Sequence, residues 1–394
     1  MMRTRLGSIA TLVLTGVTLA LTALTAASPQ TSPTVGGAGG PGQLVFIGTY
    51  TSPASQGIYA ARLNPSTGEL STPVLAAATR NPSFVAASHD GRFLYAVNEV
   101  DAVDGKPGGG VSAFAIDAKA GTLKFINQQS TVGGGPCHVS VVGSWVFVAN
   151  YGGGSIVACP VKADGSLEPA SSFVQHKGSG ANPQRQAGPH AHGVVPDPTG
   201  RFLYVPDLGL DQVKLYKIDA QAPLTPGDPP FTATAPGSGP RHITLSKDGR
   251  FAYVITEIAC TIQSFARVPE TGALTPLQTI STLPDGQSVE KGFSTAEVLV
   301  HPSGRFLVGS NRGHNSLVVY SIDKVGKLTL VQHIPTGGET PRAFNFDPTG
   351  AFVVVGNQNS DLITVFKMDA GTGKLTNTGH TAKVGKPVSF EFVR

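Results

Sequence analysis

The chain has 394 residues, of which 49 are glycine, 30 are proline and only 14% are charged. The formal net charge is +4 and no run of basic residues occurs, which argues against a nucleic-acid-binding surface. So many glycines and prolines indicate a protein with numerous turns, and the length permits one large domain with a single core.

The first 27 residues differ in composition from the rest of the chain. Arg3 and Arg5 precede an apolar run from Ile9 to Ala27, and a polar stretch rich in Ser, Thr, Pro and Gly follows. This pattern predicts a signal peptide over residues 1–27 and export of the protein, whether secreted, periplasmic or at the cell surface. An uncleaved membrane anchor is the alternative, because the apolar run is long for a signal peptide. We expect residues 28–43 to be a flexible linker.

A short phrase then recurs at intervals of 46 to 57 residues. Each copy is a turn ending in glycine, followed by Arg-Phe-Leu-Tyr or a near copy. The turn glycines are Gly91, Gly143 (in a degenerate copy), Gly200, Gly249, Gly304 and Gly350. Repeats of this length indicate an array of similar supersecondary units. The arginine that follows the glycine in most copies is expected to belong to the scaffold.

Each repeat contains four extended runs. The first follows Pro or Gly, as at residues 240–245, and the second is the recurring phrase. The third alternates, as at 213–218, and a turn such as 270–274 leads to a weaker, outer fourth strand. Runs rich in Val, Ile, Phe and Tyr between turn residues predict strands, and no useful helical stripe occurs after residue 30. Four-stranded units repeated radially are the blades of a β-propeller.

Counting the strands predicts seven blades. The second-type strands begin at residues 44–49, whereas the first-type strands begin at 82–87 and end at 387–392. The chain therefore starts at the second strand of one blade and supplies that blade's first strand from its C-terminus. We predict an all-β, seven-bladed β-propeller over residues 44–394, closed by pairing of the two ends of the chain so that no edge stays open.

The three cysteines, Cys137, Cys159 and Cys260, show no metal-binding spacing, and their number is odd. In an exported protein two of these cysteines could form a disulfide, and the sequence does not say which two. The favoured interpretation is that the cysteines are small, mostly buried packing residues.

Residues at fixed offsets from the turn glycine differ in kind between repeats. Eight residues before it stand Ser83, His192, Arg241, Ala296 and Arg342; seven after it stand Asn98, Asp207, Thr256, Asn311 and Asn357; one further stand Glu99, Leu208, Glu257, Arg312 and Gln358. The Asn, Asp and Thr side chains are expected to bond to their own turns. First and second strands are antiparallel, so these positions share one rim of the ring. His192, Arg241, Glu257 and Arg312 should therefore meet at one channel mouth, with a satisfied ion-pair network as the structural alternative.

Two local sequences add candidates at this rim. His190 and His192 lie on the same side of a strand because side chains alternate, and Arg312 and His314 share a glycine-containing loop. A metal ion would need further ligands from His242, His314, Glu257 or Glu297, and no spacing signature supports one. We predict no cofactor. The residues assigned to substrate binding are His190, His242, Glu297, Asn311, His314 and Arg342.

Five motifs carry a family resemblance: Ile-Gly-Thr-Tyr-Thr at 47–51, Pro-His-Ala-His at 189–192, Gly-Pro-Arg-His at 239–242, Ser-Asn-Arg-Gly-His at 310–314 and Ser-Phe-Glu-Phe at 389–392. With them the chain resembles the seven-bladed lactonase family over nearly all of residues 44–394. That family includes the propeller type of 6-phosphogluconolactonase and resembles the fungal carboxy-cis,cis-muconate cyclising enzymes. The site proposed for the cyclising enzymes is a His, an Arg, a Glu and a second Arg. By motif and spacing, these roles fall on His192, Arg241, Glu257 and Arg312.

The resemblance implies hydrolysis of a small-molecule lactone of sugar-acid type. Glu257 would be the general base if the channel raised its pKa, and its role could be exchanged with that of His192. Arg241 or His192 would stabilise the oxyanion, while Arg312 and Arg342 would hold an anionic group of the substrate.

Predicted export argues against intracellular 6-phosphogluconolactone as the substrate and favours an unphosphorylated sugar lactone or an aromatic-degradation lactone. Two other functions stay open: a non-catalytic exported propeller that binds a glycan, peptide or protein partner, and a muconate-lactonising isomerase. Loops 101–110, 178–188 and 283–293 are expected to shape selectivity. We expect a monomer.

Overall fold

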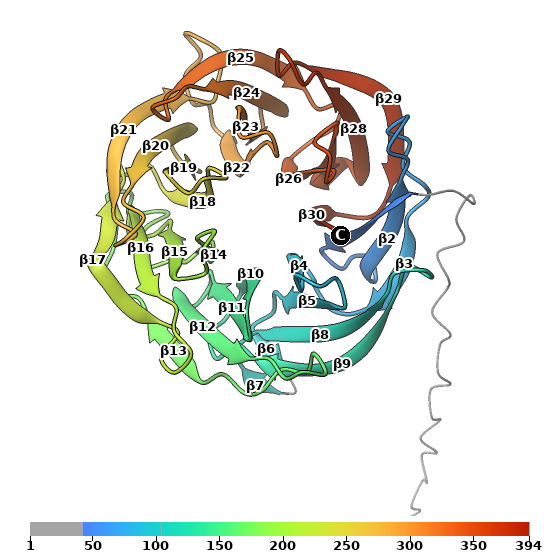
Figure 1. Cartoon of the computed structure of the whole chain (residues 1–394), viewed down its shortest axis with the longest axis vertical. Coiled ribbons are helices and arrows are strands. Elements are labelled where there is room, and N and C mark those ends of the chain that lie inside the picture. The colour runs from blue at the N-terminus through green and yellow to red at the C-terminus, as the bar shows by residue number, and fades with distance from the viewer. Residues whose placement is uncertain (1–41, 104, 394) are drawn as a thin grey trace, which may run out of the picture. The chain divides into compact units, whose positions relative to one another are not determined.

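The computed structural model describes residues 42–103 and 105–393. The predicted signal peptide and most of the predicted linker lie outside these residues. The described residues form seven four-stranded antiparallel sheets arranged radially around a central axis (Figure 1), which confirms the predicted seven-bladed β-propeller. Among them, no helix is long and apolar enough to cross a membrane.

The blades follow one another around the ring in chain order, each from its inner to its outer strand. Three blades are β4 (Val85–Ala87), β5 (Phe93–Asn98), β8 (Gly110–Asp117) and β9 (Thr122–Ser130); β10 (Pro136–Val142), β11 (Trp145–Asn150), β12 (Ser155–Pro160) and β13 (Ser172–Gln175); and β14 (Val195–Pro196), β15 (Phe202–Asp207), β16 (Gln212–Lys217) and β17 (Thr225–Ala233). The next three are β18 (Pro240–Leu245), β19 (Phe251–Thr256), β20 (Thr261–Arg267) and β21 (Leu274–Ser281); β22 (Ser294–Val300), β23 (Phe306–Arg312), β24 (Ser316–Ile322) and β25 (Leu328–Pro335); and β26 (Pro341–Phe346), β27 (Phe352–Asn357), β28 (Leu362–Met368) and β29 (Leu375–Lys383). A hairpin of β6 (Ala102–Val103) and β7 (Lys106–Pro107) and the 3-10 turn η1 (Gln358–Ser360) complete the described elements.

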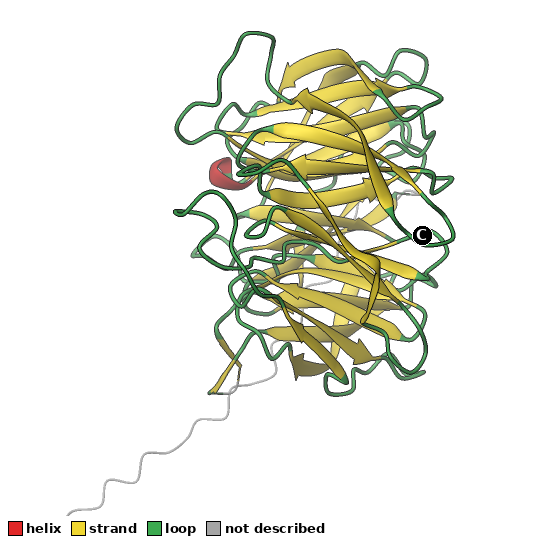
Figure 2. Cartoon of the chain, turned by 90° about the vertical axis from the view of Figure 1, so that its left-hand side faces the viewer, coloured by secondary structure: helices red, strands yellow, loops and turns green. Residues whose placement is uncertain are grey.

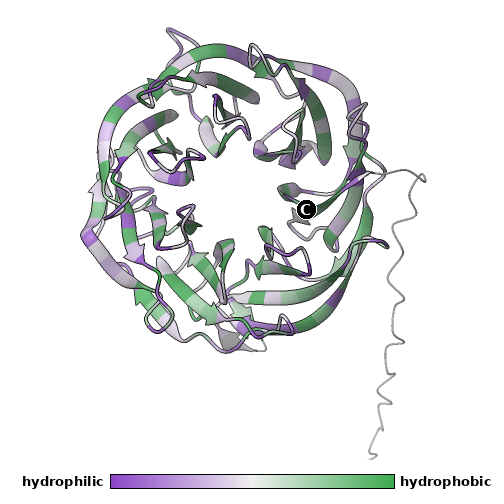
Figure 3. Cartoon of the chain, in the orientation of Figure 1, coloured by the Kyte–Doolittle hydropathy of each residue, from purple (hydrophilic) through white to green (hydrophobic). Residues whose placement is uncertain are grey.

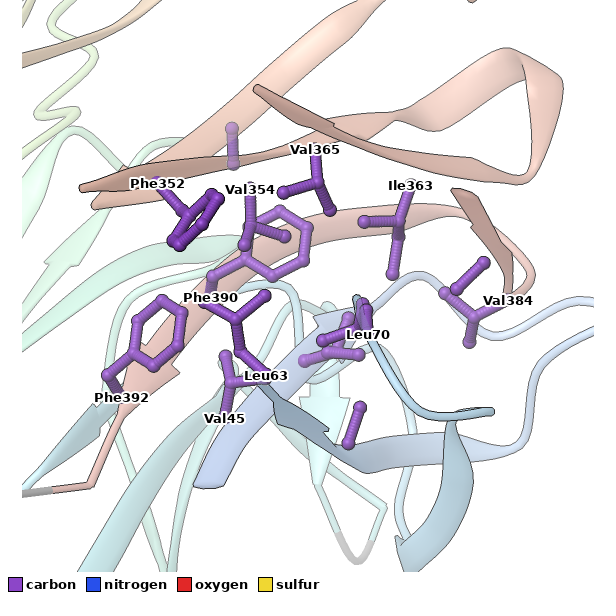
Figure 4. Close-up of a cluster of buried hydrophobic side chains, with 14 residues drawn as sticks. Val45, Leu63, Leu70, Phe352, Val354, Ile363, Val365, Val384, Phe390 and Phe392 are labelled. Carbon is purple, nitrogen blue, oxygen red and sulfur yellow. The ribbon is translucent and has the colours of Figure 1, made fainter. Parts of the chain in front are cut away.

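The remaining blade closes the ring. Its inner strand β30 (Pro387–Phe392) pairs antiparallel with β1 (Gln43–Thr49), which is followed outwards by β2 (Gly57–Leu63) and β3 (Val74–Ala78). The predicted pairing of the two ends of the chain is thus confirmed, and β1 begins at the last residue of the predicted linker. Phe390 and Phe392 of β30 are buried against Phe352 and Ile363 of the neighbouring blade (Figure 4).

Apolar side chains alternate along the strands and pack between adjacent blades. Green, hydrophobic stretches alternate with pale and purple ones along the strands, and many loops are pale or purple (Figure 3). One such cluster joins Tyr253 and Ile255 of β19 to Val298 of β22 and Tyr320 of β24. Each blade buries its two faces against the two neighbouring blades, so the hydrophobic core is distributed around the ring. The axial channel can therefore be lined by polar residues.

The arginine of the recurring phrase is part of the scaffold, as predicted. Arg92, Arg201, Arg250 and Arg305 each place the guanidinium 5.0–5.5 Å from the ring of the phenylalanine that follows. Cation–π contacts at such exposed sites contribute about 0.5–1 kcal/mol each. These side chains belong to the turns between first and second strands.

The polar residues that end the second strands bond partly to their own turns, as expected, and partly across blades. Thr256 bonds to Thr261 across the turn that follows it, and Asp207 accepts the N–H of Gly209 in its own following turn. The Asn150 amide donates to the Thr131 carbonyl at 3.0 Å, and the Asn311 amide donates to the Thr282 carbonyl at 2.9 Å. Thr131 and Thr282 each follow the outer strand of the preceding blade. Both asparagines are buried, so their amides satisfy carbonyls that water does not reach.

The cysteines are free thiols, and all three are buried. Cys159 packs in an apolar cluster between two blades, in agreement with the packing role that the sequence favoured.

Candidate functional site

Irregular pairing places several side chains at one mouth of the axial channel. The pairing of an inner strand with its second strand shifts between Pro136 and His138, Pro240 and His242, Thr295 and Val298, and Pro341 and Ala343. The residues inside these shifts include Cys137, Arg241, Glu297 and Arg342. A β-bulge re-aims the side chains that it contains, and bulges are frequent beside active sites. This mouth is on the face that carries η1, from which long loops project (Figure 2).

Glu257 is the centre of a charged cluster at this mouth. Its Oε2 lies 2.8 Å from Nη2 of Arg312 and 3.2 Å from Nε of Arg241, and its Oε1 lies 2.6 Å from Nη2 of Arg185. We call Arg185, Arg241, Glu257 and Arg312 the rim cluster. Three of its members are the residues that the offset alignment selected, and they come from two adjacent blades.

Arg185 was not selected from the sequence. It lies in the long loop between β13 and β14, and its side chain is 44% exposed, whereas that of Glu257 is 7% exposed. The loop is anchored by buried Gln186, whose amide donates to the Leu208 carbonyl and to Asp211, both at 2.7 Å. A loop residue has no fixed offset from a turn glycine, so only the prediction that loop 178–188 shapes selectivity pointed towards it.

The protonation of Glu257 differs from what a general base requires. Burial by itself would raise its pKa, but the charges of Arg312 and Arg241 and the hydrogen bond from Arg185 outweigh this effect and lower the pKa to about 2. The condition under which Glu257 was expected to be the base is therefore not met. At neutral pH Glu257 is a carboxylate that holds guanidinium groups in place.

Two histidines of the Pro-His-Ala-His motif lie beside Tyr151. The His190 ring stacks on the Tyr151 ring with centroids 4.6 Å apart, and its Nδ1 donates to the Tyr151 carbonyl at 2.9 Å. The His192 ring meets Tyr151 and His242 edge-on at 5.2 Å. Burial and the charge of Arg241 lower the pKa of His192 well below its usual value, so its imidazole is neutral at working pH.

A second carboxylate lies at the same mouth. The Tyr50 hydroxyl donates to Glu99 Oε2 at 2.8 Å and accepts from Arg342 Nη2 at 3.0 Å, and Ser83 also bonds to Glu99. Tyr50 belongs to the Ile-Gly-Thr-Tyr-Thr motif, and Glu99 occupies the same offset as Glu257. Four guanidinium groups thus accompany two carboxylates, which leaves the mouth with an excess of positive charge.

Deeper in the channel, His242 and Glu297 form a buried pair. His242 Nδ1 lies 2.8 Å from Glu297 Oε1, and its Nε2 lies 3.3 Å from Nη1 of Arg241. They line a cavity of about 230 Å³ together with Phe84, His138 and other residues of the inner strands. Burial raises the pKa of Glu297 to about 7.

Sequence alignment missed His138 because the degenerate repeat has a shorter turn. Cys137 and His138 precede Gly143 by 6 and 5 residues, whereas the corresponding Arg241 and His242 precede Gly249 by 8 and 7 residues. His138 and His242 occupy equivalent positions in the pairing of their blades, and their ring centroids lie 5.3 Å apart.

Two of the predicted substrate-binding residues lie apart from the rim cluster. Asn311 is fully buried, and its amide nitrogen donates hydrogen bonds to the Thr282 carbonyl and the Ser316 hydroxyl. His314 packs edge-on against Phe293 and bonds through Nδ1 to Ser316. We therefore assign Asn311 to the scaffold. Among the described residues, no three His, Cys, Asp or Glu side chains are placed to share a metal ion.

The fold and this mouth define a seven-bladed propeller with a cluster of charged side chains at one end of its axial channel. The family model described as "Lactonase, 7-bladed beta-propeller" matches residues 44–392, and the chain belongs to this lactonase family. The chain is 36% identical over 351 residues to the 6-phosphogluconolactonase of Bacillus subtilis, covering 88% of this chain and 97% of that protein.

Two further relatives agree. A 6-phosphogluconolactonase of Formosa agariphila is 33% identical over 339 residues, covering 84% of this chain and 94% of that protein. The structure of the periplasmic gluconolactonase PpgL of Pseudomonas aeruginosa superposes with a TM-score of 0.84 at 37% identity, covering 89% of this chain and 99% of that chain.

Proposed function

We propose that the chain hydrolyses the lactone of a sugar acid that carries an anionic group, and that it does so at the channel mouth of the rim cluster. The observation that supports this most is the grouping of four guanidinium groups with two carboxylates beside the neutral His192. Guanidinium groups bind carboxylate and phosphate in a bidentate manner, so either anion would suit this mouth. Relatives named 6-phosphogluconolactonase and gluconolactonase support a sugar-acid lactone.

In this proposal His192 is the general base, because its imidazole is neutral and, unlike the Glu257 carboxylate, forms no ion pair with the other described residues. A neutral imidazole accepts a proton from water as the water oxygen attacks the lactone carbonyl. The carbonyl oxygen becomes an oxyanion in the tetrahedral intermediate. When the intermediate collapses, the ring C–O bond breaks and the imidazolium returns the proton to the departing ring oxygen. The product carries a new hydroxyl and a new carboxyl group, so atoms and charge balance.

Arg241 is the proposed oxyanion donor. It is 3% exposed, and its Nε, although 3.2 Å from Glu257, has no hydrogen-bond acceptor in suitable geometry among the described residues. A buried donor without an acceptor is costly in the free protein and becomes satisfied when an oxyanion forms beside it. Glu257 keeps the guanidinium of Arg241 oriented. Arg185 and Arg342 are the proposed partners of the anionic group.

Lactone hydrolysis by the purified protein tests the proposal. Acid release would be followed in a pH-stat on glucono-δ-lactone, 6-phosphoglucono-δ-lactone and a carboxylate-bearing aldarolactone, after subtraction of the spontaneous rate. We expect the two anionic lactones to show the higher kcat/KM. Absence of turnover on every lactone would contradict the proposal.

Two variants test the assigned roles. We expect His192→Gln to lower kcat by at least about 100-fold, the usual contribution of a positioned acid–base group. We expect Arg185→Met to raise KM for the anionic lactones by about 10- to 100-fold, because a hydrogen bond to a charged group contributes about 1.5–3 kcal/mol. The control is Arg305→Met, a scaffold arginine, which should leave both constants unchanged. An equal effect of Arg185→Met on neutral glucono-δ-lactone would contradict anion binding by Arg185.

We also propose that the protein is exported. The charged and then apolar pattern of residues 1–27 and the 37% identity to a periplasmic gluconolactonase support this location. Cell fractionation followed by N-terminal sequencing should find a mature protein that begins near Ser28. An intact N-terminus in the cytoplasmic fraction would contradict it.

A further inference from the structure

Comparison of the seven blades with one another reveals one exceptional buried pair. The residue directly after each outer strand and the residue at or near the end of the second strand of the next blade occupy equivalent positions in all seven blades. In four blades a hydrogen bond joins the two residues. In chain order these pairs are Thr79 with Asn98, Thr131 with Asn150, His176 with Asp207, Thr234 with Thr256, Thr282 with Asn311, Thr336 with Asn357, and Val384 with Thr49. Small neutral residues occupy six of the seven pairs. The remaining pair, His176 with Asp207, combines an imidazole with a carboxylate.

The exceptional pair is completely buried and has partners on both sides. His176 Nδ1 lies 2.6 Å from Asp207 Oδ2, and its Nε2 lies 2.9 Å from the Tyr216 hydroxyl. The side chains of His176 and Asp207 are 1% and 0% exposed. Burying a carboxylate costs free energy unless it is paired and hydrogen-bonded, so this arrangement needs a compensating reason.

The second oxygen of Asp207 points to that reason. Oδ1 accepts the backbone N–H of His190 at 2.8 Å and that of Gly209 at 3.0 Å. In the blades of Asn150 and Asn311 the corresponding amide oxygen has no hydrogen-bond partner among the described residues. Asp207 therefore uses for the Pro-His-Ala-His segment an acceptor that, within the described ranges, has no partner in the blades of Asn150, Asn311 and Asn357.

The segment held in this way carries both histidines of the mouth. The N–H of His192 donates to the Pro206 carbonyl at 2.9 Å, one residue before Asp207. His190 donates its Nδ1–H to the Tyr151 carbonyl, so its Nε2 carries the lone pair. A small rotation of the segment would break this bond and turn the His192 ring away from Tyr151 and His242.

We propose that His176 and Asp207 are positioning residues that hold His190 and His192 in their working orientation. This inference rests on the proposed function insofar as it concerns catalysis. Neither residue is placed to touch the substrate; both act through the backbone of the histidine segment. A charge-assisted hydrogen bond is shorter and stronger than a neutral one, which is why a His–Asp pair holds the segment better than the Thr–Asn pair of other blades.

The test uses pairs that the other blades already contain. H176T/D207T installs the Thr234–Thr256 combination and removes the carboxylate acceptor of the His190 N–H. H176T/D207N installs the Thr131–Asn150 combination, whose amide oxygen can still accept that N–H. The control N357T creates a Thr–Thr pair in the blade of Arg342, where the Asn357 amide bonds to Thr364 and touches neither histidine of the segment.

Nitrogen-15 NMR of the imidazoles of His190 and His192 in the full-length protein is the decisive measurement. In the wild type we expect a single Nδ1–H tautomer for His190. In H176T/D207T we expect the His190 signals to shift towards a tautomer mixture and kcat to fall about 10- to 100-fold with KM changed less than about threefold, as for other second-layer partners of functional histidines. H176T/D207N should recover part of both effects, and N357T should show neither.

Wild-type imidazole signals in folded H176T/D207T would overturn the inference. If H176T/D207T fails to fold, H176T/D207N and N357T are compared in the same way, and identical His190 signals in the two would overturn it. The NMR readout does not need turnover. If the wild type hydrolyses no lactone, the proposed function fails while the positioning role is still decided.

Discussion

At the residue scale, two buried glutamates at the channel have opposite protonation behaviour. Glu257 contacts three guanidinium groups, and its pKa falls to about 2. Glu297 contacts a histidine and a backbone N–H, and burial raises its pKa to about 7. The difference arises from their charged neighbours, since both side chains are removed from water.

The raised pKa of Glu297 predicts a pH-dependent stability. A carboxyl whose folded-state pKa lies above its unfolded value stabilises the fold fully only below about pH 4.5, and this stability is lost as the pH rises through 7. Glu297→Gln keeps an acceptor for His242 and removes the titration. We expect the free energy of unfolding of Glu297→Gln, relative to wild type, to increase by on the order of 3 kcal/mol between pH 4.5 and pH 8.

Urea unfolding at several pH values measures this difference. The control is Glu339→Gln, which makes the same substitution at an exposed glutamate. A constant difference for Glu297→Gln across the window would show that Glu297 does not titrate there.

At the scale of elements, neighbouring blades are joined by buried polar contacts as well as by apolar clusters. Arg267 at the end of β20 bonds to Asp197 of the preceding blade at 2.7 Å and to the Tyr204 hydroxyl at 2.7 Å. The side chains of this ion pair are 2% and 0% exposed. Arg250 and Asp248 form an exposed pair at 2.7 Å in the turn before β19.

Because one ion pair is buried and the other is exposed, we expect replacing the arginine by methionine to lower the free energy of unfolding by different amounts in the two pairs. Arg267→Met leaves Asp197 as an unpaired buried charge, which costs about 3–5 kcal/mol of unfolding free energy. Arg250→Met removes an exposed pair, which contributes about 0–1 kcal/mol. Denaturant unfolding of the two variants measures the difference. Equal losses would contradict this account, and kcat/KM per folded molecule should stay unchanged in both.

At the scale of the whole molecule, a single strand closes the ring. β30 supplies the inner strand of the blade that contains β1, and its two phenylalanines fill the core between the first and last blades. Each Phe→Ala change in a core costs about 3–5 kcal/mol, and a whole domain is stable by only about 5–15 kcal/mol.

A chain that ends at residue 386 should therefore lose its cooperative unfolding transition. It would expose β1 as an open edge and lose Phe390 and Phe392 from the core. Addition of a synthetic peptide of residues 387–394 should restore the transition, measured by Trp145 fluorescence, whereas a scrambled peptide should not. A truncated chain with wild-type stability would contradict closure by β30.

Several features were predictable because regular strands convert sequence spacing into position. The turn glycines marked equivalent points in each blade, so offsets from them identified Arg241, Glu257 and Arg312 before any coordinates were known. The same method failed for His138, whose repeat has a shorter turn, and for Arg185, whose place in a long loop has no fixed offset from a turn glycine. It also assigned Asn311 to the substrate, although that side chain is used between blades.

The sequence by itself thus determined the seven blades, the closure by the C-terminal strand and the rim on which Arg241, Glu257 and Arg312 meet, because all three follow from a repeated pattern along the chain. Only the tertiary structure decided that Glu257 stays ionised, that Arg185 completes its ion pairs and that Asp207, paired with His176, accepts the backbone N–H of His190. Those properties depend on burial and on charges contributed by different blades. The electrostatic interactions depend on distances in space, which the spacing of residues along the chain does not encode.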